Sequence, residues 1–102
     1  MSKKRVVITG AGVVSPIGNT INDFWNGMIS GKNGAGLITK FDTEKFTTKF
    51  AFEVKDFSFE GVIDPREARR MDIGAQYAMV AADEAVKNSG LNLEDLDPER
   101  AG

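Results

Sequence analysis

The feature that most constrains the fold is a helical stretch that is small or apolar on nearly every face. It runs from Ile73 to a glycine at position 90, and its small and apolar residues include Gly74, Ala75, Ala78, Ala81 and Ala82. A helix that lacks a broad polar face is normally buried between other elements. The stretch therefore predicts a layered fold in which this helix is covered by a sheet.

Local signals predict where the helices of this region begin and end. Asp64 is a good N-cap, Pro65 suits the first helical position, and Glu67 completes the capping-box spacing. Asp72 can cap a second helix, so a short helix followed by a longer one is expected. Gly90 is placed to end the longer helix, with Leu91 making the apolar contact of the C-cap; a polar loop is expected after it.

Earlier in the chain, a shorter amphipathic helix is expected between Thr20 and Gly31. The Thr20 side chain can cap its first turn, and Gly31 can end it in a left-handed conformation. One stripe of apolar residues recurs at helical spacing, which predicts packing in a core. The stripe consists of Ile21, Phe24, Trp25, Met28 and Ile29.

Two segments have the pattern of β-strands. The β-branched run 6–8 predicts a strand buried on both faces, as in α/β folds. Residues 50–55 alternate apolar with other side chains, and Phe50, Phe52 and Val54 form the apolar phase of a half-buried strand. Two strands are too little sheet to cover the long helix. We therefore expect residues 1–102 to be the N-terminal portion of a larger α/β domain.

Composition narrows the chemistry that this chain can perform. It has 102 residues, with no Cys and no His, so it can form no disulfide, thiolate nucleophile or imidazole base, and no zinc site is expected. With 13 basic and 15 acidic residues the chain carries a net charge of −2. Aromatic residues on a strand, as at 50–55, can stack on the bases of single-stranded nucleic acid, but the negative charge argues against such a partner. No apolar run is long enough to span a membrane, and no signal peptide is expected. The expected compartment is the cytoplasm.

One glycine motif invites a nucleotide-binding interpretation. Gly10 and Gly12 follow the first strand, as in the dinucleotide fingerprint G-x-G-x-x-G. The third glycine of that fingerprint would fall at position 15, which is Ser15, and Pro16 follows. The short-chain reductase variant needs glycine at position 14, where this chain has Val14. A nucleotide-binding oxidoreductase is therefore the weakest of the alternatives.

The same segment, taken with its neighbours, resembles the β-ketoacyl-acyl-carrier-protein synthases, the condensing enzymes of fatty acid synthesis. The resemblance covers the whole chain, and its central part is nearer to the synthase II branch than to synthase I. The matching segments are Val6 to Asn19, Phe24-Trp25, Gly31, Gly34, Phe41-Asp42, Thr48 to Ala51, Val54 to Phe57, Arg69 to Asp72, Gln76-Tyr77, Asp83 to Ala85 and Ser89 to Leu91.

This resemblance implies a thiolase-like fold, built of five αβαβα layers in two related halves and usually found as a homodimer. It implies decarboxylative Claisen condensation of an acyl-enzyme with malonyl-acyl carrier protein, carried out by a Cys and two His. Because the chain contains neither residue type, no position carries over as catalytic, and the 102-residue chain alone is predicted to be inactive. No cofactor and no metal are implied. A non-catalytic ketosynthase-like subunit and a polyketide ketosynthase are the alternatives.

The resemblance also implies a docking surface for the acidic, phosphopantetheine-bearing acyl carrier protein. The family places basic residues in the segment that matches positions 65–71, where this chain has Arg66, Arg69 and Arg70. Positions i, i+3 and i+4 share one face of a helix, and arginine binds carboxylates and phosphates in bidentate geometry. A solvated basic helix face is the simpler interpretation of the same pattern.

Overall fold

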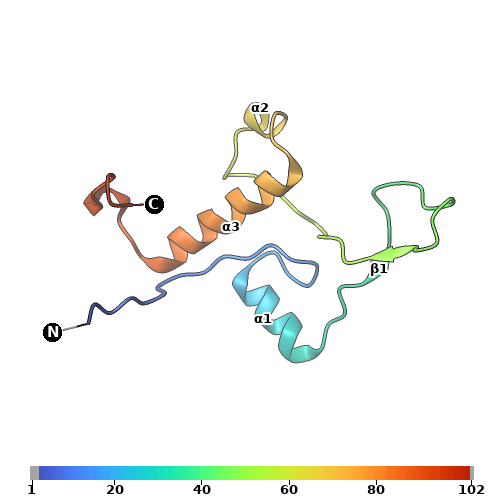
Figure 1. The fold of residues 1–102 in the computed structure, drawn as a ribbon, viewed down its shortest axis with the longest axis horizontal. Helices are drawn as coiled ribbons and strands as arrows, with labels where there is room; N and C mark the ends of the chain where they lie inside the picture. Colours follow the sequence, from blue (N-terminus) through green and yellow to red (C-terminus); the bar gives the residue numbers. More distant parts are fainter. Residues whose placement is uncertain (1–2, 102) are drawn as a thin grey trace.

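The computed structural model describes residues 3–101, which form three α-helices, one two-stranded sheet and one 3₁₀ turn (Figure 1). The order is α1 (Ile21–Ser30), β1 (Gly36–Leu37), β2 (Phe50–Ala51), α2 (Pro65–Ala68), α3 (Ile73–Ser89) and a 3₁₀ turn, Leu93–Asp95. The strands pair antiparallel, with Gly36 opposite Ala51 and Leu37 opposite Phe50. No helix among these residues is long and apolar enough to cross a membrane.

The helix ends lie where the local signals predict them. The Thr20 hydroxyl accepts a hydrogen bond of 3.1 Å from the Asp23 amide, which caps α1. Gly31 and Gly90 close α1 and α3 with φ angles of 74° and 73°, in the left-handed region that favours glycine. Asp72 stands at the N-cap of α3, although its side chain makes no capping hydrogen bond. The division into a short and a long helix is confirmed.

The glycine motif is explained by close packing of backbone on α3. A Cβ atom at Gly10 would lie 2.4 Å from the Ala85 carbonyl oxygen, and one at Gly12 would lie 1.8 Å from the Ala81 carbonyl oxygen. Figure 1 shows this N-terminal segment between α3 and α1. Only glycine permits such an approach, because any side chain would overlap the helix backbone. Packing on α3 therefore accounts for both glycines.

The described chain is open and elongated. Its radius of gyration is 17.6 Å, whereas a compact chain of this length would have about 13 Å. Its accessible surface is 8670 Å², against about 5,700 Å² for a compact monomer of this mass. The only buried apolar side chains among residues 3–101 are Ile63 and Ala68. The structure thus has helices in place but almost no core.

Three predictions about burial are wrong for this chain. Residues 6–8 form no strand, because no other described segment lies beside them to pair, and their side chains are exposed. The α1 stripe is not in a core, since Trp25 and Met28 are more than half exposed. No residue of α3 is buried, although the glycine segment, the start of α1, Ala68 and Phe57 all contact it, because none of them forms a covering layer.

The strand predicted over residues 50–55 is partly correct. It is paired only at Phe50–Ala51. Of the predicted apolar phase, Phe50 and Phe52 are exposed and only Val54 is half-buried, as are Ala51 and Glu53 of the other phase. The face of β2 that carries the two phenylalanines has no covering layer among residues 3–101. Alternation of apolar and polar side chains predicts a strand. It does not determine which face of that strand another element covers.

Candidate functional site

The three arginines predicted as a docking surface lie at the short helix α2 and the turn that follows it. The Asp64 side chain accepts a hydrogen bond of 2.8 Å from the Arg66 amide and so caps the helix. Arg66 lies within α2, Arg69 is its C-cap residue, and Arg70 lies in the turn before α3. All three residues are exposed.

The backbone hydrogen bonds show how these positions relate. The Arg69 amide donates to the Pro65 carbonyl at 3.3 Å, four residues back, whereas the Arg70 amide donates to the Glu67 carbonyl at 3.0 Å, three residues back. The hydrogen bonding therefore changes from the α-helical pattern at Arg69 to a tighter turn at Arg70, and residues three apart in the helical part lie on one face. Arg66 and Arg69 share one side of the turn, and Arg70 follows about a third of a turn later.

This turn is held firmly against the rest of the chain. Ala68 is buried on its inner side, as is Ile63 just before the helix. The Gln76 side-chain amide, from the first turn of α3, donates to the Ala68 carbonyl at 3.0 Å. The guanidinium groups therefore extend from an anchored scaffold.

The arginines are not neutralised by neighbouring carboxylates. Within residues 3–101 the only ion pair joins Lys87 and Asp83, one helical turn apart in α3, at 2.9 Å. Arg66, Arg69 and Arg70 thus have no carboxylate oxygen within salt-bridge distance. Their positive charge is available to an acidic partner.

Glu84 is the residue of greatest structural consequence that the sequence did not indicate. Its Oε1 accepts a hydrogen bond of 3.0 Å from the Val13 amide, and its Oε2 accepts one of 2.9 Å from the Ile21 amide at the start of α1. A carboxylate is favoured at a helix N-terminus, where the amides are unpaired and the dipole is positive. One side chain of α3 therefore fixes both the N-terminal segment and α1. Glu84 is one of two neighbouring acidic residues on α3, so no local signal in the sequence singled it out.

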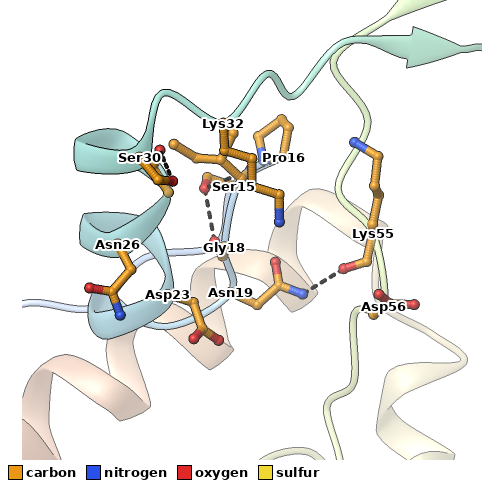
Figure 2. A pocket seen from close by; sticks show the side chains of 12 residues that line it. Ser15, Pro16, Gly18, Asn19, Asp23, Asn26, Ser30, Lys32, Lys55 and Asp56 are labelled. Carbon is orange, nitrogen blue, oxygen red and sulfur yellow. Dashed lines mark hydrogen bonds between the residues drawn. The ribbon is translucent and has the colours of Figure 1, made fainter.

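A polar hollow of about 520 Å³ lies beside α1, between the loop that precedes the helix and residues 55–56 (Figure 2). Its polar groups mostly bond to the chain itself. Ser15 Oγ donates to the Gly18 carbonyl at 2.8 Å, and Asn19 Nδ2 donates to the Lys55 carbonyl at 2.7 Å. Asn19 Oδ1 is buried without a hydrogen-bond partner. The hydrogen bonds of Ser15 and Asn19 hold loop 15–19 in place. The residues that line the hollow include no nucleophile paired with a base.

The pKa of the Glu53 carboxyl is lowered from its ordinary value. Desolvation on its own would raise the pKa of the carboxyl, but hydrogen bonds from the Thr39 hydroxyl and from the Thr39 and Lys40 amides outweigh it and lower the pKa. The carboxylate joins the segments that follow β1 and β2. It stabilises a loop, and its position suggests no catalytic role.

Comparison with known proteins identifies the family of this chain. Residues 3–102 match the model of the beta-ketoacyl synthase N-terminal domain. The chain is 50% identical over 99 residues to 3-oxoacyl-[acyl-carrier-protein] synthase 2 of Staphylococcus aureus (strain N315), covering 97% of this chain and 24% of that protein. It is 44% identical over 102 residues to the synthase of the same name from Coxiella burnetii (strain RSA 493 / Nine Mile phase I), covering 100% of this chain and 25% of that protein.

A solved structure has the same fold over this region. The ishigamide ketosynthase/chain length factor superposes with a TM-score of 0.84 at 41% sequence identity, over 93% of this chain and 24% of that one. The chain thus spans about a quarter of the length of the relatives it matches. Its open shape is the shape that the same segment has within a ketosynthase chain. The 102-residue chain belongs to the beta-ketoacyl synthase family, as an N-terminal portion of its ketosynthase domain, in the synthase II branch.

Proposed function

We propose that the chain contributes the carrier-protein docking surface of a condensing enzyme of fatty acid synthesis, a 3-oxoacyl-acyl-carrier-protein synthase of the synthase II branch. The observation that carries this proposal is the exposed arginine cluster of α2, unpaired with carboxylate and anchored through Ala68 and Gln76. The partner is an acyl carrier protein, which is acidic and bears a phosphopantetheine arm.

In the proposed reaction an acyl group passes from the carrier-protein thioester to a cysteine thiolate, releasing the carrier thiol. Malonyl-carrier protein then loses CO₂, and the resulting carbanion attacks the acyl-enzyme thioester. The new carbon–carbon bond gives 3-oxoacyl-carrier protein, and the thiolate leaves. The cysteine, and the histidines that stabilise the enolate, are residue types absent from these 102 residues. The part assigned to this chain is recognition, and we expect the chain alone to form no ketoacyl product.

The docking chemistry follows from the positions of the arginines. Arg66 and Arg69, on one side of the turn, can each form two parallel hydrogen bonds to a carboxylate, and Arg70 extends the positive surface. Contacts of this exposed kind contribute about 0.2–1 kcal/mol each and act mainly on the association rate. Three together give modest affinity with strong dependence on salt.

Charge reversal tests the docking surface. Arg69→Glu removes one attraction and adds one repulsion, so we expect about 5- to 30-fold weaker binding of holo-acyl carrier protein at low salt, equivalent to about 1–2 kcal/mol. Surface plasmon resonance with immobilised carrier protein measures this, and most of the loss should be in the association rate. The matched control is Lys45→Glu, an equal charge change on an exposed loop residue outside α2. Equal weakening by both variants, or by neither, contradicts the proposal.

A second candidate is a ketosynthase-like subunit of a polyketide system. It is favoured by the similarity to the ishigamide ketosynthase/chain length factor, at 41% identity. The two candidates differ in carrier preference, so the same binding assay with fatty acid and polyketide carrier proteins separates them. We expect tighter binding of the fatty acid carrier protein.

A further inference from the structure

The side chain of Gln76 links the first turn of α3 to the turn that carries the arginines. Its Nε2 donates to the Ala68 carbonyl at 3.0 Å and, more weakly, to the Met71 carbonyl at 3.4 Å. A side-chain NH₂ group has two hydrogens, so one amide can bond to both carbonyls. These carbonyls flank Arg69 and Arg70 in the chain. A single side chain therefore holds both ends of the segment that contains the two arginines.

The carbonyl of Ala68 needs this donor because α2 ends so early. In a continued α-helix it would accept from the amide of residue 72, but Asp72 has a ψ of 149° and begins a new helix. It accepts instead from the Met71 amide at 3.1 Å and from Gln76. Since Ala68 is only 4% exposed, water cannot readily replace a lost donor. Gln76 thus supplies the donor that the break between the two helices removes.

Gln76 extends from a backbone that is itself fixed. It is half-buried, and its amide donates to the Asp72 carbonyl at 3.1 Å in the first turn of α3. The neighbouring Tyr77 packs edge-to-face on Phe57, with ring centroids 4.7 Å apart. Figure 1 shows α2 beside this end of α3. The hydrogen bonds of Gln76 therefore tie the arginine turn to a rigid element.

We propose that Gln76 positions Arg69 and Arg70 for contact with carrier protein. The inference rests on the proposed function, because it assigns Gln76 a role in the same surface. A turn released from Gln76 has to be ordered again on binding, which lowers affinity. Arg66 precedes both anchored carbonyls, and its amide is held separately by the Asp64 side chain at 2.8 Å. Binding through Arg69 and Arg70 should thus depend on Gln76, whereas binding through Arg66 should not.

Amide hydrogen exchange, measured without carrier protein, tests the hold of Gln76 on the turn. Gln76→Met keeps a similar side-chain length and helix propensity but has no donor. The Met71 amide should then exchange about 2- to 12-fold faster, the factor expected for loss of one neutral hydrogen bond. Asn88→Leu is the matched control, because Asn88 Nδ2 also donates from α3 to a backbone carbonyl, that of Ala11, at 3.3 Å. The control should leave exchange of the Met71 amide unchanged.

A double-mutant cycle on the binding of holo-acyl carrier protein tests which arginines depend on Gln76. Arg69→Ala should weaken binding at low salt by about 2- to 5-fold in the wild-type background, measured by surface plasmon resonance. In the Gln76→Met background the same substitution should cost less, because Arg69 is already poorly placed. Arg66→Ala should cost the same in both backgrounds.

Failure of this inference can be told apart from failure of the proposed function. A wild-type chain that does not bind carrier protein overturns the proposed function, and the docking role of Gln76 with it. If the wild type binds and Gln76→Met binds equally well, only the positioning role is overturned. Unchanged exchange of the Met71 amide, or equal coupling of Arg66 and Arg69 to Gln76, also overturns it.

Circular dichroism of each variant checks that α3 is retained. Gln76→Asn keeps the amide but is one methylene shorter, so it should lose the 3.0 Å bond to the Ala68 carbonyl while remaining polar. If Gln76→Met is not helical, Gln76→Asn takes its place in every measurement, with the same expected direction.

Discussion

Substitution of Gly12 by alanine probes the contact that joins the N-terminal segment to α3. The new Cβ atom would lie 1.8 Å from the Ala81 carbonyl oxygen. Both atoms are fixed to a backbone, so no side-chain rotation can relieve the overlap. An ordinary contact begins at 3.4 Å, so the segment must move about 1.6 Å off the helix. The 3.0 Å bond from the Val13 amide to Glu84 and the 3.3 Å bond from Asn88 to the Ala11 carbonyl would then be lost.

The expected cost of Gly12→Ala follows from those two bonds. A hydrogen bond to a charged group contributes about 1.5–3 kcal/mol and a neutral one about 1 kcal/mol, so the free energy of unfolding should fall by about 2.5–4 kcal/mol. Urea unfolding followed by circular dichroism measures it. Gly36→Ala is the matched control, because a Cβ there meets nothing within 4 Å. If Gly12→Ala is as stable as Gly36→Ala, the close-packing explanation of the glycine motif is refuted.

Two other predictions concern single carboxylates. Glu84→Gln keeps one acceptor oxygen but places an NH₂ group against either the Val13 or the Ile21 amide, so one of the two hydrogen bonds is lost. We expect the free energy of unfolding to fall by about 1–3 kcal/mol, measured again by urea unfolding. An unchanged urea midpoint would contradict the bridging role of Glu84. The pKa of Glu53 is lowered in the folded chain, so its stabilisation is fully present above the unfolded carboxyl pKa and is lost as the pH falls through the folded value. Hydrogen exchange of the Thr39 amide should therefore quicken in acid, and Glu53→Gln should remove that pH dependence.

The features that sequence predicted well are those governed by a few neighbouring residues. The caps at Thr20 and Asp64 and the left-handed glycines at Gly31 and Gly90 depend on side chains and φ preferences within one turn. They appear where they were expected. The division before α3 is likewise local.

The features that sequence did not predict depend on distant contacts. Glu84 bonds to residues 63 and 71 positions away in the chain, a pairing that no local pattern encodes. Strand formation by residues 6–8 needs a partner strand, and burial of α3 needs a covering layer; neither is supplied by the described residues. The short helix at Pro65–Ala68 was predicted, but the tighter turn that follows it at Arg70 was not.

The central claim, that α2 and its following turn bind carrier protein, is tested most directly by mapping the contact. Holo-acyl carrier protein is titrated into the ¹⁵N-labelled chain, and amide chemical shifts are followed by NMR. The account predicts shifts concentrated at Arg66, Arg69, Arg70 and their neighbours, diminishing as salt is added. Shifts centred on α1 or on the polar hollow beside it, with residues 64–71 unchanged, would contradict it.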